Sequence, residues 1–343
     1  MAHLHGLPPE LVIEIMTRHL SLYDLLPLIE ASTESLSCLL VNRQQIILPH
    51  VEEIMARLGG NIYSAGLLAA RLRILRSQPT FNTLSPTEAQ KVIRPLVVRY
   101  AAQKEPDGLS CQASLATLCA LSTLSRQIKE TLDSRPWIKE GIFSREALDT
   151  RKHPSDKIQQ SIVINAACRF EAYTLAFFRQ EEILCDKDSH IRKFFFCPGL
   201  DPFARFSSLR DYSKPAFYGI ALDIYDDHFI MVYNVLQRLY SENLADRNPS
   251  LGLEHLPQEE KYSPLMNVTE FTLHKYVHYL TSQGLETFTR LERMHREDEE
   301  NFVSRTFNKI SLSSHPVAHM VPIQDHPLDT DGYTRGWRAK WHP

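Results

Sequence analysis

Apolar side chains recur every three or four residues along most of the chain, which is the spacing of one face of an α-helix. Such stripes predict helices over about 7–20, 47–58, 63–76, 121–132, 156–177, 222–239 and 273–280. Leu, Ala, Glu, Gln and Arg are frequent in these stretches and favour helix. Twelve glycines in 343 residues are few, so the tight turns of a β-rich fold are scarce. The pattern predicts an all-α fold.

Local start signals divide the first thirty residues into two helices. The sequence Leu7-Pro8-Pro9-Glu10 places proline in a first helical turn, where no backbone N–H is needed. This helix should end near Leu20. The second should start within Ser21–Asp24, and with Asp24 as its N-cap Pro27 falls at the third helical position, where it costs no hydrogen bond.

Glycine and proline predict further boundaries. Gly59-Gly60 should stop the helix that contains Val51, and Ser85-Pro86-Thr87-Glu88 is a capping box that should start another. Pro49 either kinks its segment or starts a new helix. Pro198, Gly199, Pro202 and Pro215 should break helix between about Asp186 and Pro215, which leaves a loop rich in phenylalanine.

No repeat of fixed period is present, so the helices predict an irregular α-helical array and not a solenoid. The polar stretch Arg151–Ser155 is the best candidate for a linker. The expected organisation is a small trihelical unit at 1–48, a helical region continuing from it over 49–150, a C-terminal helical domain at 155–310 and an extended tail at 311–343.

Charge and hydropathy exclude several classes of function. The formal net charge is −3 with acidic and basic residues mixed, unlike the basic stripe or tail of a nucleic-acid-binding protein. No window reaches the roughly 18 apolar residues of a membrane span, and the N-terminus lacks the basic segment and apolar run of a secretory signal. We therefore expect an intracellular protein, cytoplasmic or nuclear, that binds neither nucleic acid nor membrane.

No motif in the sequence points to catalysis. There is no G-x-S-x-G, no P-loop and no glycine-rich dinucleotide turn, and the six cysteines form no CxxC pair. His274 and His278 have the spacing of a zinc site, but Lys275 stands where the metalloprotease pattern has glutamate. The consecutive residues of Asp226-Asp227-His228 point in different directions on a helix. We expect no enzyme activity, no cofactor and no metal.

The N-terminal residues resemble the F-box family. In that family an LPxE opening leads an amphipathic helix, and after a short break an Asp-Leu pair opens a second helix. The matching residues here are Leu7-Pro8-Pro9-Glu10, continuing to Met16, and Asp24-Leu25. The resemblance covers the first two of three expected helices.

The resemblance implies a trihelical unit whose apolar face inserts between C-terminal helices of a Skp-family adaptor. The adaptor joins a cullin, so the chain would be the substrate receptor of a Skp–cullin–F-box ubiquitin ligase with an unknown protein client. A unit of roughly 40 residues also buries too little surface to be stable without a partner or a larger domain. The expected adaptor-binding residues have helix-in-groove spacing. They are Leu7, Pro8, Leu11, Ile15, Leu20, Leu25, Leu28 and Ile29.

Two features differ from the family pattern. Arg18-His19 adds one residue ahead of Leu20, which closes the first helix. The third helix carries Leu36-Ser37-Cys38-Leu39-Leu40 where the family has a basic-aromatic ending.

Further patches leave the function of the rest of the chain open. Arg43–Leu48 and Arg169-Phe170-Glu171-Ala172-Tyr173 are similar to segments of uncharacterised F-box-like proteins of filamentous fungi. The alternative class is an all-α scaffold or regulatory interaction protein in which the box-like segment is only core. Candidate client-binding residues are the loop aromatics, unless these clamp the loop onto the helices, and the tail tryptophans. They are Phe194, Phe195, Phe196, Phe203 and Phe206, and Trp337 and Trp341.

Overall fold

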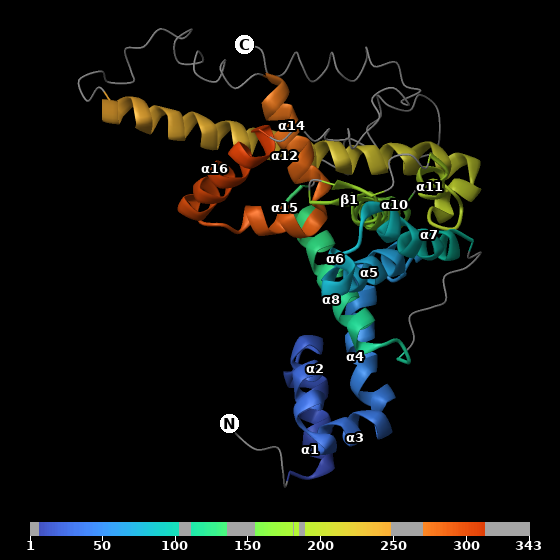
Figure 1. Cartoon of the computed structure of the whole chain (residues 1–343). Coiled ribbons are helices and arrows are strands. Elements are labelled where there is room, and N and C mark those ends of the chain that lie inside the picture. The colour runs from blue at the N-terminus through green and yellow to red at the C-terminus, as the bar shows by residue number, and fades with distance from the viewer. Residues whose placement is uncertain are drawn as a thin grey trace. The chain divides into compact units, whose positions relative to one another are not determined.

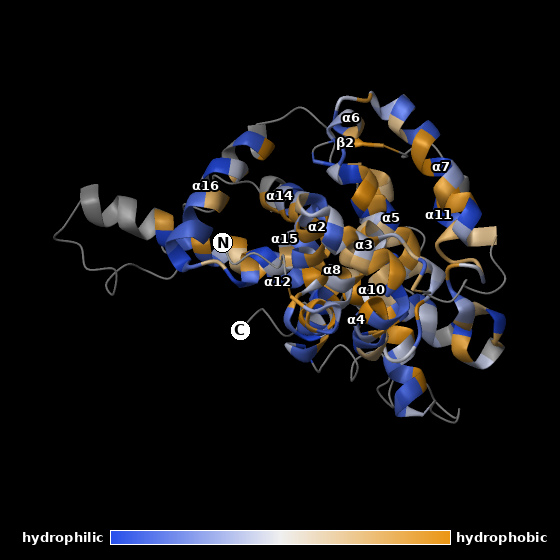
Figure 2. Cartoon of the chain, turned by 90° about the horizontal axis from the view of Figure 1, so that it is seen from below, coloured by the Kyte–Doolittle hydropathy of each residue, from blue (hydrophilic) through white to orange (hydrophobic). Residues whose placement is uncertain are grey.

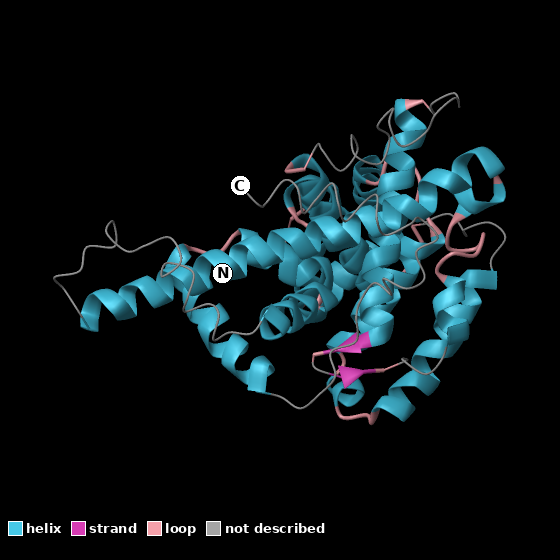
Figure 3. Ribbon diagram, turned by 90° about the horizontal axis from the view of Figure 1, so that it is seen from above, coloured by secondary structure: helices cyan, strands magenta, loops and turns pink. Residues whose placement is uncertain are grey.

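The computed structural model describes residues 7–102, 111–135, 155–180, 182–184, 189–247 and 270–312. Helices hold most of these residues (Figure 3), and the predicted all-α fold is confirmed. Within the described part of the chain, the only sheet pairs β1 (Phe178–Arg179) with β2 (Glu182–Ile183). The chain divides into two compact units, Met1–Asp223 with Gln283–Arg293 and Ile224–Ser282 with Met294–Pro343.

The first unit contains most of the described helices (Figure 1). They are α1 (Pro9–Glu14), the π-helical turn η1 (Ile15–His19), α2 (Leu22–Ala31), α3 (Thr33–Val41), α4 (Arg43–Arg57), α5 (Ser64–Ser77), α6 (Pro79–Asn82), α7 (Pro86–Ala102), α8 (Leu115–Asp133), α10 (Asp156–Phe177), α11 (Ser189–Phe194), the 3-10 helix η3 (Pro202–Arg205) and α15 (Gly284–Glu292). Helix α12 (Ser207–Arg247) has residues in both units, and the second unit also holds α14 (Glu270–Ser282) and α16 (Arg296–Leu312).

The first predicted helix is divided into α1 and η1. In η1 the Leu20 N–H donates to the Ile15 carbonyl at 3.1 Å, so this hydrogen bond spans five residues where an α-helix spans four. A π-helical turn therefore takes up one residue more than an α-helical turn. The added residue at Arg18-His19 fits into the helix in this way, and Leu20 still ends it.

Helix α4 completes the hydrogen bonding of the π turn. The Met16 carbonyl loses its α-helical donor, because the Leu20 N–H is bonded to Ile15. His50 of α4 is buried and places its Nε2 3.3 Å from the Met16 oxygen. For this contact to be a hydrogen bond, Nε2 carries the proton. Helix α4 runs through Pro49 without interruption, so the segment around Pro49 is one helix.

Helix α2 begins within the expected segment Ser21–Asp24. Ser21 is its N-cap, the Asp24 N–H donates to the Ser21 hydroxyl oxygen at 3.3 Å, and the Ser21 N–H donates to the Asp24 carboxylate at 3.1 Å. Hydrogen bonds from Ser21 lower the pKa of the Asp24 carboxyl. Of the two candidates Ser21, and not Asp24, is the cap, and Pro27 lies inside the helix.

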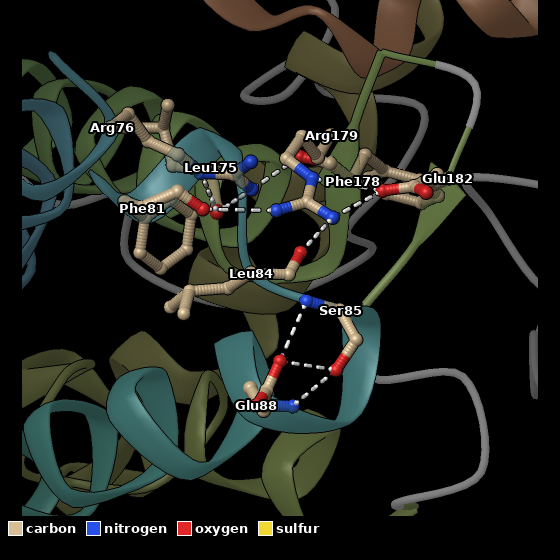
Figure 4. Close-up of polar contacts among 9 residues, drawn as sticks. All are labelled: Arg76, Phe81, Leu84, Ser85, Glu88, Leu175, Phe178, Arg179 and Glu182. Atoms are coloured by element: carbon tan, nitrogen blue, oxygen red, sulfur yellow. Dashed lines mark hydrogen bonds and ion pairs between the residues drawn. The ribbon is translucent and has the colours of Figure 1, made fainter. Parts of the chain in front are cut away.

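Two predicted boundaries are confirmed. Gly59 and Gly60 follow α4 with φ of +72° and +88°, a conformation that glycine adopts without strain. Before α7 the Ser85 N–H and hydroxyl donate to the Glu88 carboxylate at 2.9 and 2.7 Å, and the Glu88 N–H reaches the Ser85 oxygen at 3.4 Å (Figure 4). These bonds lower the pKa of the Glu88 carboxyl.

Two arginines satisfy backbone carbonyls near α6 and at the end of α10 (Figure 4). Arg179 donates to the Phe81 and Leu84 carbonyls at 3.0 and 2.7 Å. Arg76 donates to the Leu175 carbonyl at 3.1 Å. The guanidinium groups of Arg76 and Arg179 both lie over the Phe81 ring, 5.2 and 6.0 Å from its centroid, respectively. The start of the β1–β2 hairpin is thereby attached to α5 and α6.

Helix α5 lies at the centre of the first unit and contacts α7, α8 and α10. Hydrophobic residues gather where these helices meet (Figure 2). Close approach of α5 and α10 depends on a small residue, since a Cβ at Gly66 would lie 3.3 Å from the Cys168 sulfur. The expected boundary at 151–155 does not separate the units, because the helices before and after it share one core; residues 151–154 lie outside the described residues.

Glu171 of α10 joins four helices through its carboxylate. Its Oε1 accepts a hydrogen bond from Nε of Arg73 in α5 at 2.8 Å, and Arg73 also donates to Gln127 of α8 at 2.5 Å. Its Oε2 accepts the Leu285 N–H at the start of α15 at 2.7 Å. The side chains of Arg73 and Glu171 are 9% and 2% exposed. A Cβ at Gly284 would lie 2.6 Å from Oε2, so this close approach requires glycine.

Arg169, also in α10, forms a second buried ion pair. It donates to the Asp201 carboxylate at 2.8 Å and to the Phe195 and Ser213 carbonyls at 3.2 and 2.7 Å. Burial lowers the pKa of the Arg169 guanidinium, and the charge of Asp201 opposes that shift. These bonds attach the segment before α12, and the start of α12, to α10.

Two predictions about the later helices need correction. The region expected to be a loop between 186 and 215 contains α11, η3 and the first residues of α12, and Pro215 lies inside α12. In the second unit the buried residues of α12 are Ile224, His228, Val232 and Val235. The predicted stripe is therefore only partly covered, with Val232 buried, Leu222 exposed, and Tyr225, Phe229, Leu236 and Leu239 half-buried. The stripe of α14 is confirmed, with Leu273, Tyr276, Val277 and Leu280 all buried.

Deletion of Arg18 should convert η1 into a regular α-helical turn and leave Leu20 at the end of the helix. The Leu20 N–H then keeps the Ile15 carbonyl as its acceptor, now as an ordinary α-helical hydrogen bond, so we expect the Tm to stay within about 3 °C of the parent. Deletion of Arg71, also exposed, is the control, because it rotates the rest of α5 by about 100° and moves Leu72 out of the core. Thermal unfolding followed by circular dichroism distinguishes the two; equal losses would contradict the π-turn explanation.

Replacement of Glu171 by alanine should lower the free energy of unfolding by about 3–5 kcal/mol, because it leaves the Arg73 charge buried without its carboxylate. The matched control is Glu53→Ala, which removes an exposed carboxylate that pairs with Arg57 one turn away and should cost less than about 0.5 kcal/mol. Urea denaturation measures both. Similar losses for the two variants would show that the buried pair does not hold the four helices together.

Candidate functional site

The predicted docking residues differ in exposure. Leu7, Pro8 and Leu11 are exposed, and the two leucines are 39% and 46% accessible. Half-buried positions are Ile15, Leu20, Leu28 and Ile29. Leu25 is fully buried. The structure therefore leaves the residues of the Leu-Pro opening and Leu11 available to a partner, and it removes Leu25 from the surface.

Leu25 belongs to the core of the trihelical unit. Helix α3 packs against both α1 and α2, and the buried apolar residues of these helices and η1 are Val12, Met16, Leu22, Leu25 and Leu39. Helical spacing placed Leu25, Leu28 and Ile29 on one side of α2. In the structure Leu25 is buried in the core, while Leu28 and Ile29 on the same side of α2 are only half-buried.

Helix α3 adds exposed apolar side chains that the sequence analysis did not assign to docking. Leu36, Leu40 and Val41 are 38%, 63% and 82% exposed. Leu36 and Leu40 are one turn apart and share a face of the helix. Because α3 packs against α1, these residues lie on the helix next to Leu7 and Leu11. We call the set Leu7, Pro8, Leu11, Leu36, Leu40 and Val41 the N-terminal apolar surface. Its signal in the sequence was the repeat of leucine at i, i+4 in a short amphipathic helix.

The trihelical unit is attached to the rest of the first unit through α2 and α4. The Tyr23 hydroxyl donates to the Cys119 carbonyl of α8 at 2.8 Å, and the Cys119 thiol donates to the Leu22 carbonyl at 3.3 Å. Arg43 of α4 donates to the carbonyls of Cys111 and Ala113 at 2.7 and 2.5 Å.

Burial keeps the donors of this attachment protonated. It raises the pKa of the Tyr23 phenol and of the Cys119 thiol, in each case as the largest cause. Both groups therefore keep donating at neutral pH. These hydrogen bonds involve α2 and α4, so they leave the N-terminal apolar surface uncovered.

The histidines of the second unit take part in packing between α12 and α14. The Tyr225 hydroxyl is hydrogen-bonded to Nδ1 of His274, and Nδ1 of the buried His228 lies 3.2 Å from the Thr281 hydroxyl. Burial, with a smaller effect of the Asp227 charge, raises the pKa of Asp226 to about 6. Among the described residues no group of three His, Cys, Asp or Glu side chains is placed to hold a metal ion.

The loop aromatics mostly clamp their segment onto the helices. Phe195 is fully buried, and its ring centroid lies 5.4 Å from that of Tyr173 in α10. Phe203 lies 5.8 Å from Tyr63. Phe206 is 57% exposed and is the exception. Phe194 and Phe196 are half-buried, and the Phe196 ring centroid lies 5.2 Å from that of Phe217 in α12. The tail candidates, Trp337 and Trp341, lie outside the described residues.

No protein-family model, curated protein or solved structure matches the chain. The F-box resemblance therefore depends on the N-terminal residues alone. No helix of the described residues combines the length and apolar character needed to cross a membrane.

Leu11→Ala should change the free energy of unfolding by less than about 0.5–1 kcal/mol, because the side chain is half exposed and has little packing to lose. Leu25→Ala, the matched core substitution, should cost about 2–5 kcal/mol. Urea denaturation of the full chain gives both values. A loss of several kcal/mol for Leu11→Ala would mean that this leucine is needed for packing and is not free to bind a partner.

Proposed function

We propose that the chain is a substrate receptor of a Skp–cullin–F-box ubiquitin ligase. In this proposal the trihelical unit docks on a Skp-type adaptor, which recruits a cullin, and the helical array carries the surface for a protein client. The observation that carries it is the exposure of Leu7, Pro8 and Leu11 at the F-box-like opening, although other apolar residues of the same helices are buried. Exposed apolar residues on short helices suit insertion into a groove between helices.

The size of the N-terminal apolar surface is adequate for stable docking. A fully buried leucine contributes about 1.5–3 kcal/mol before ordering costs, and a micromolar complex needs about 8 kcal/mol. What a residue gains on docking scales with the area it still exposes. Leu40 and Val41 expose more than Leu7 and Leu11, so we expect α3 to contribute at least as much as α1.

The alternative function, an all-α scaffold or regulatory interaction protein, is favoured by a different observation. Met16, Leu22 and Leu25 are buried, and α2 is hydrogen-bonded to α8, so the box-like segment also completes the core of the first unit. Adaptor binding separates the two functions, since a scaffold has no need of it. Under the favoured proposal the chain needs no catalytic residue, metal or cofactor of its own and works in the cytoplasm or nucleus.

Two double variants test adaptor binding, Leu7→Ala with Leu11→Ala and Leu36→Ala with Leu40→Ala. Each should weaken binding of a purified Skp-type adaptor by about 2 kcal/mol, roughly 30-fold in Kd, measured by calorimetry. The matched control is Val92→Ala with Val98→Ala on α7, where the side chains are 40% and 38% exposed. Unchanged affinity of both test variants, or no binding by the parent chain, would refute the proposal.

A further inference from the structure

Three buried side chains of the first unit each have one polar atom without a hydrogen-bond partner among the described residues. The atoms are Asn165 Oδ1, Arg169 Nε and Asp201 Oδ1. Asn165 and Arg169 are completely buried, and Asp201 is 2% exposed. By contrast, both carboxylate oxygens of the buried Glu171 on α10 are hydrogen-bonded. Burying a polar atom without a partner is costly, so each of the three atoms needs one.

The three atoms lie at one junction, between α10 and residues 200–201. Asn165 and Arg169 are one turn apart on α10 and share a face. Asn165 donates from Nδ2 to the Leu200 carbonyl at 3.3 Å, and Arg169 donates from Nη1 to Asp201 Oδ2 at 2.8 Å. In each side chain the unpartnered atom is bonded to the same carbon as the atom that crosses the junction. Covalent geometry therefore keeps all three unpartnered atoms close to it.

The unpartnered atoms do not form a set that could satisfy itself. The amide oxygen of Asn165 and the carboxylate oxygen of Asp201 accept hydrogen bonds, whereas Nε of Arg169 donates one. Direct contact would thus leave at least one oxygen without a donor. A metal ion at the junction would be repelled by the guanidinium group and an anion by the carboxylate. An ammonium ion has no lone pair to accept from Arg169.

A water molecule has the complementary pattern, because it can donate two hydrogen bonds and still accept from Nε. We infer that one water molecule is bound at this junction, where it donates to Asn165 Oδ1 and Asp201 Oδ1 and accepts from Arg169 Nε. Its three hydrogen bonds are about the usual number for a buried water in a protein.

This bound water connects α10 with the segment that leads into α12. The start of α12 belongs to the same network, since Arg169 donates to the Ser213 hydroxyl at 3.0 Å and that hydroxyl donates to the Asp201 carboxylate. The exposed Phe206 lies between Asp201 and Ser213 in sequence. The water site therefore helps to hold both ends of the segment that presents Phe206. The inference is independent of adaptor binding.

A crystal structure of the full chain at a resolution that shows ordered water tests the site directly. We expect one water about 2.7–3.2 Å from Asn165 Oδ1, Asp201 Oδ1 and Arg169 Nε. Three outcomes overturn the inference. They are no density among the three atoms, direct contact between the two oxygens, and a metal ion identified by its anomalous scattering.

Oxygen-17 magnetic relaxation dispersion tests the site in solution, because it counts long-lived internal waters. The test variant is Asn165→Leu, which is similar in size. A methyl group in place of Oδ1 requires about 3.5 Å of separation and so displaces a water held at hydrogen-bond distance. The matched control is Thr174→Val on the same helix. Thr174 is 1% exposed, and its hydroxyl already donates to the Glu171 carbonyl at 2.9 Å.

We expect Asn165→Leu to lose one long-lived water relative to the parent and Thr174→Val to lose none. An unchanged count for Asn165→Leu, or equal losses for the two variants, overturns the inference. Circular dichroism checks that both variants fold. If Asn165→Leu does not fold, the crystal structure of the parent chain decides by the outcomes given for it.

Discussion

A carboxylate taken out of water has to meet a cation or a set of hydrogen-bond donors, and Glu171 meets both inside the first unit. Its partners, Arg73 and the Leu285 N–H, are 98 and 114 residues away along the chain. Separation of α5 from α10 therefore leaves two buried charges unpaired, and loss of α15 or α8 removes a hydrogen bond from the pair. Gly284 is fixed by the same requirement, since only a residue without a Cβ lets the start of α15 approach the carboxylate.

The five-residue patch around Glu171 is a structural centre. All of Arg169–Tyr173 is buried, and successive side chains reach different neighbours. Arg169 pairs with Asp201, Glu171 pairs with Arg73, and Tyr173 stacks on Phe177 with ring centroids 4.5 Å apart. A short stretch of one helix thus joins segments that precede and follow it in sequence.

The trihelical unit uses its apolar residues in two ways. One part completes a core with α4 and α8, through Leu22, Leu25 and the hydrogen bonds of Tyr23. The other part, on α1 and α3, stays exposed. A unit of this size cannot bury all its apolar side chains by itself, so a division of this kind follows from its surface-to-volume ratio. The π turn accommodates the added residue before Leu20, so the residues that follow keep their buried or exposed positions.

Local signals in the sequence determined the helical class, most helix positions and the capping box at Ser85–Glu88, whose partners all lie within one helical turn. They were ambiguous where two residues suit the same role, as with Ser21 and Asp24 at the start of α2. Proline at 27 and 215 did not end helices, because packing outweighs one missing backbone donor.

The tertiary structure alone decided which face of each helix is covered. Spacing identified Leu11 and Leu25 equally well as docking residues, yet Leu25 is buried and Leu11 is 46% exposed. The boundary expected at 151–155 failed for the same reason, since α5 and α10 come together from opposite sides of it. Periodicity depends on residues a few positions apart, whereas burial depends on neighbours about a hundred residues away, and only folding brings these neighbours together.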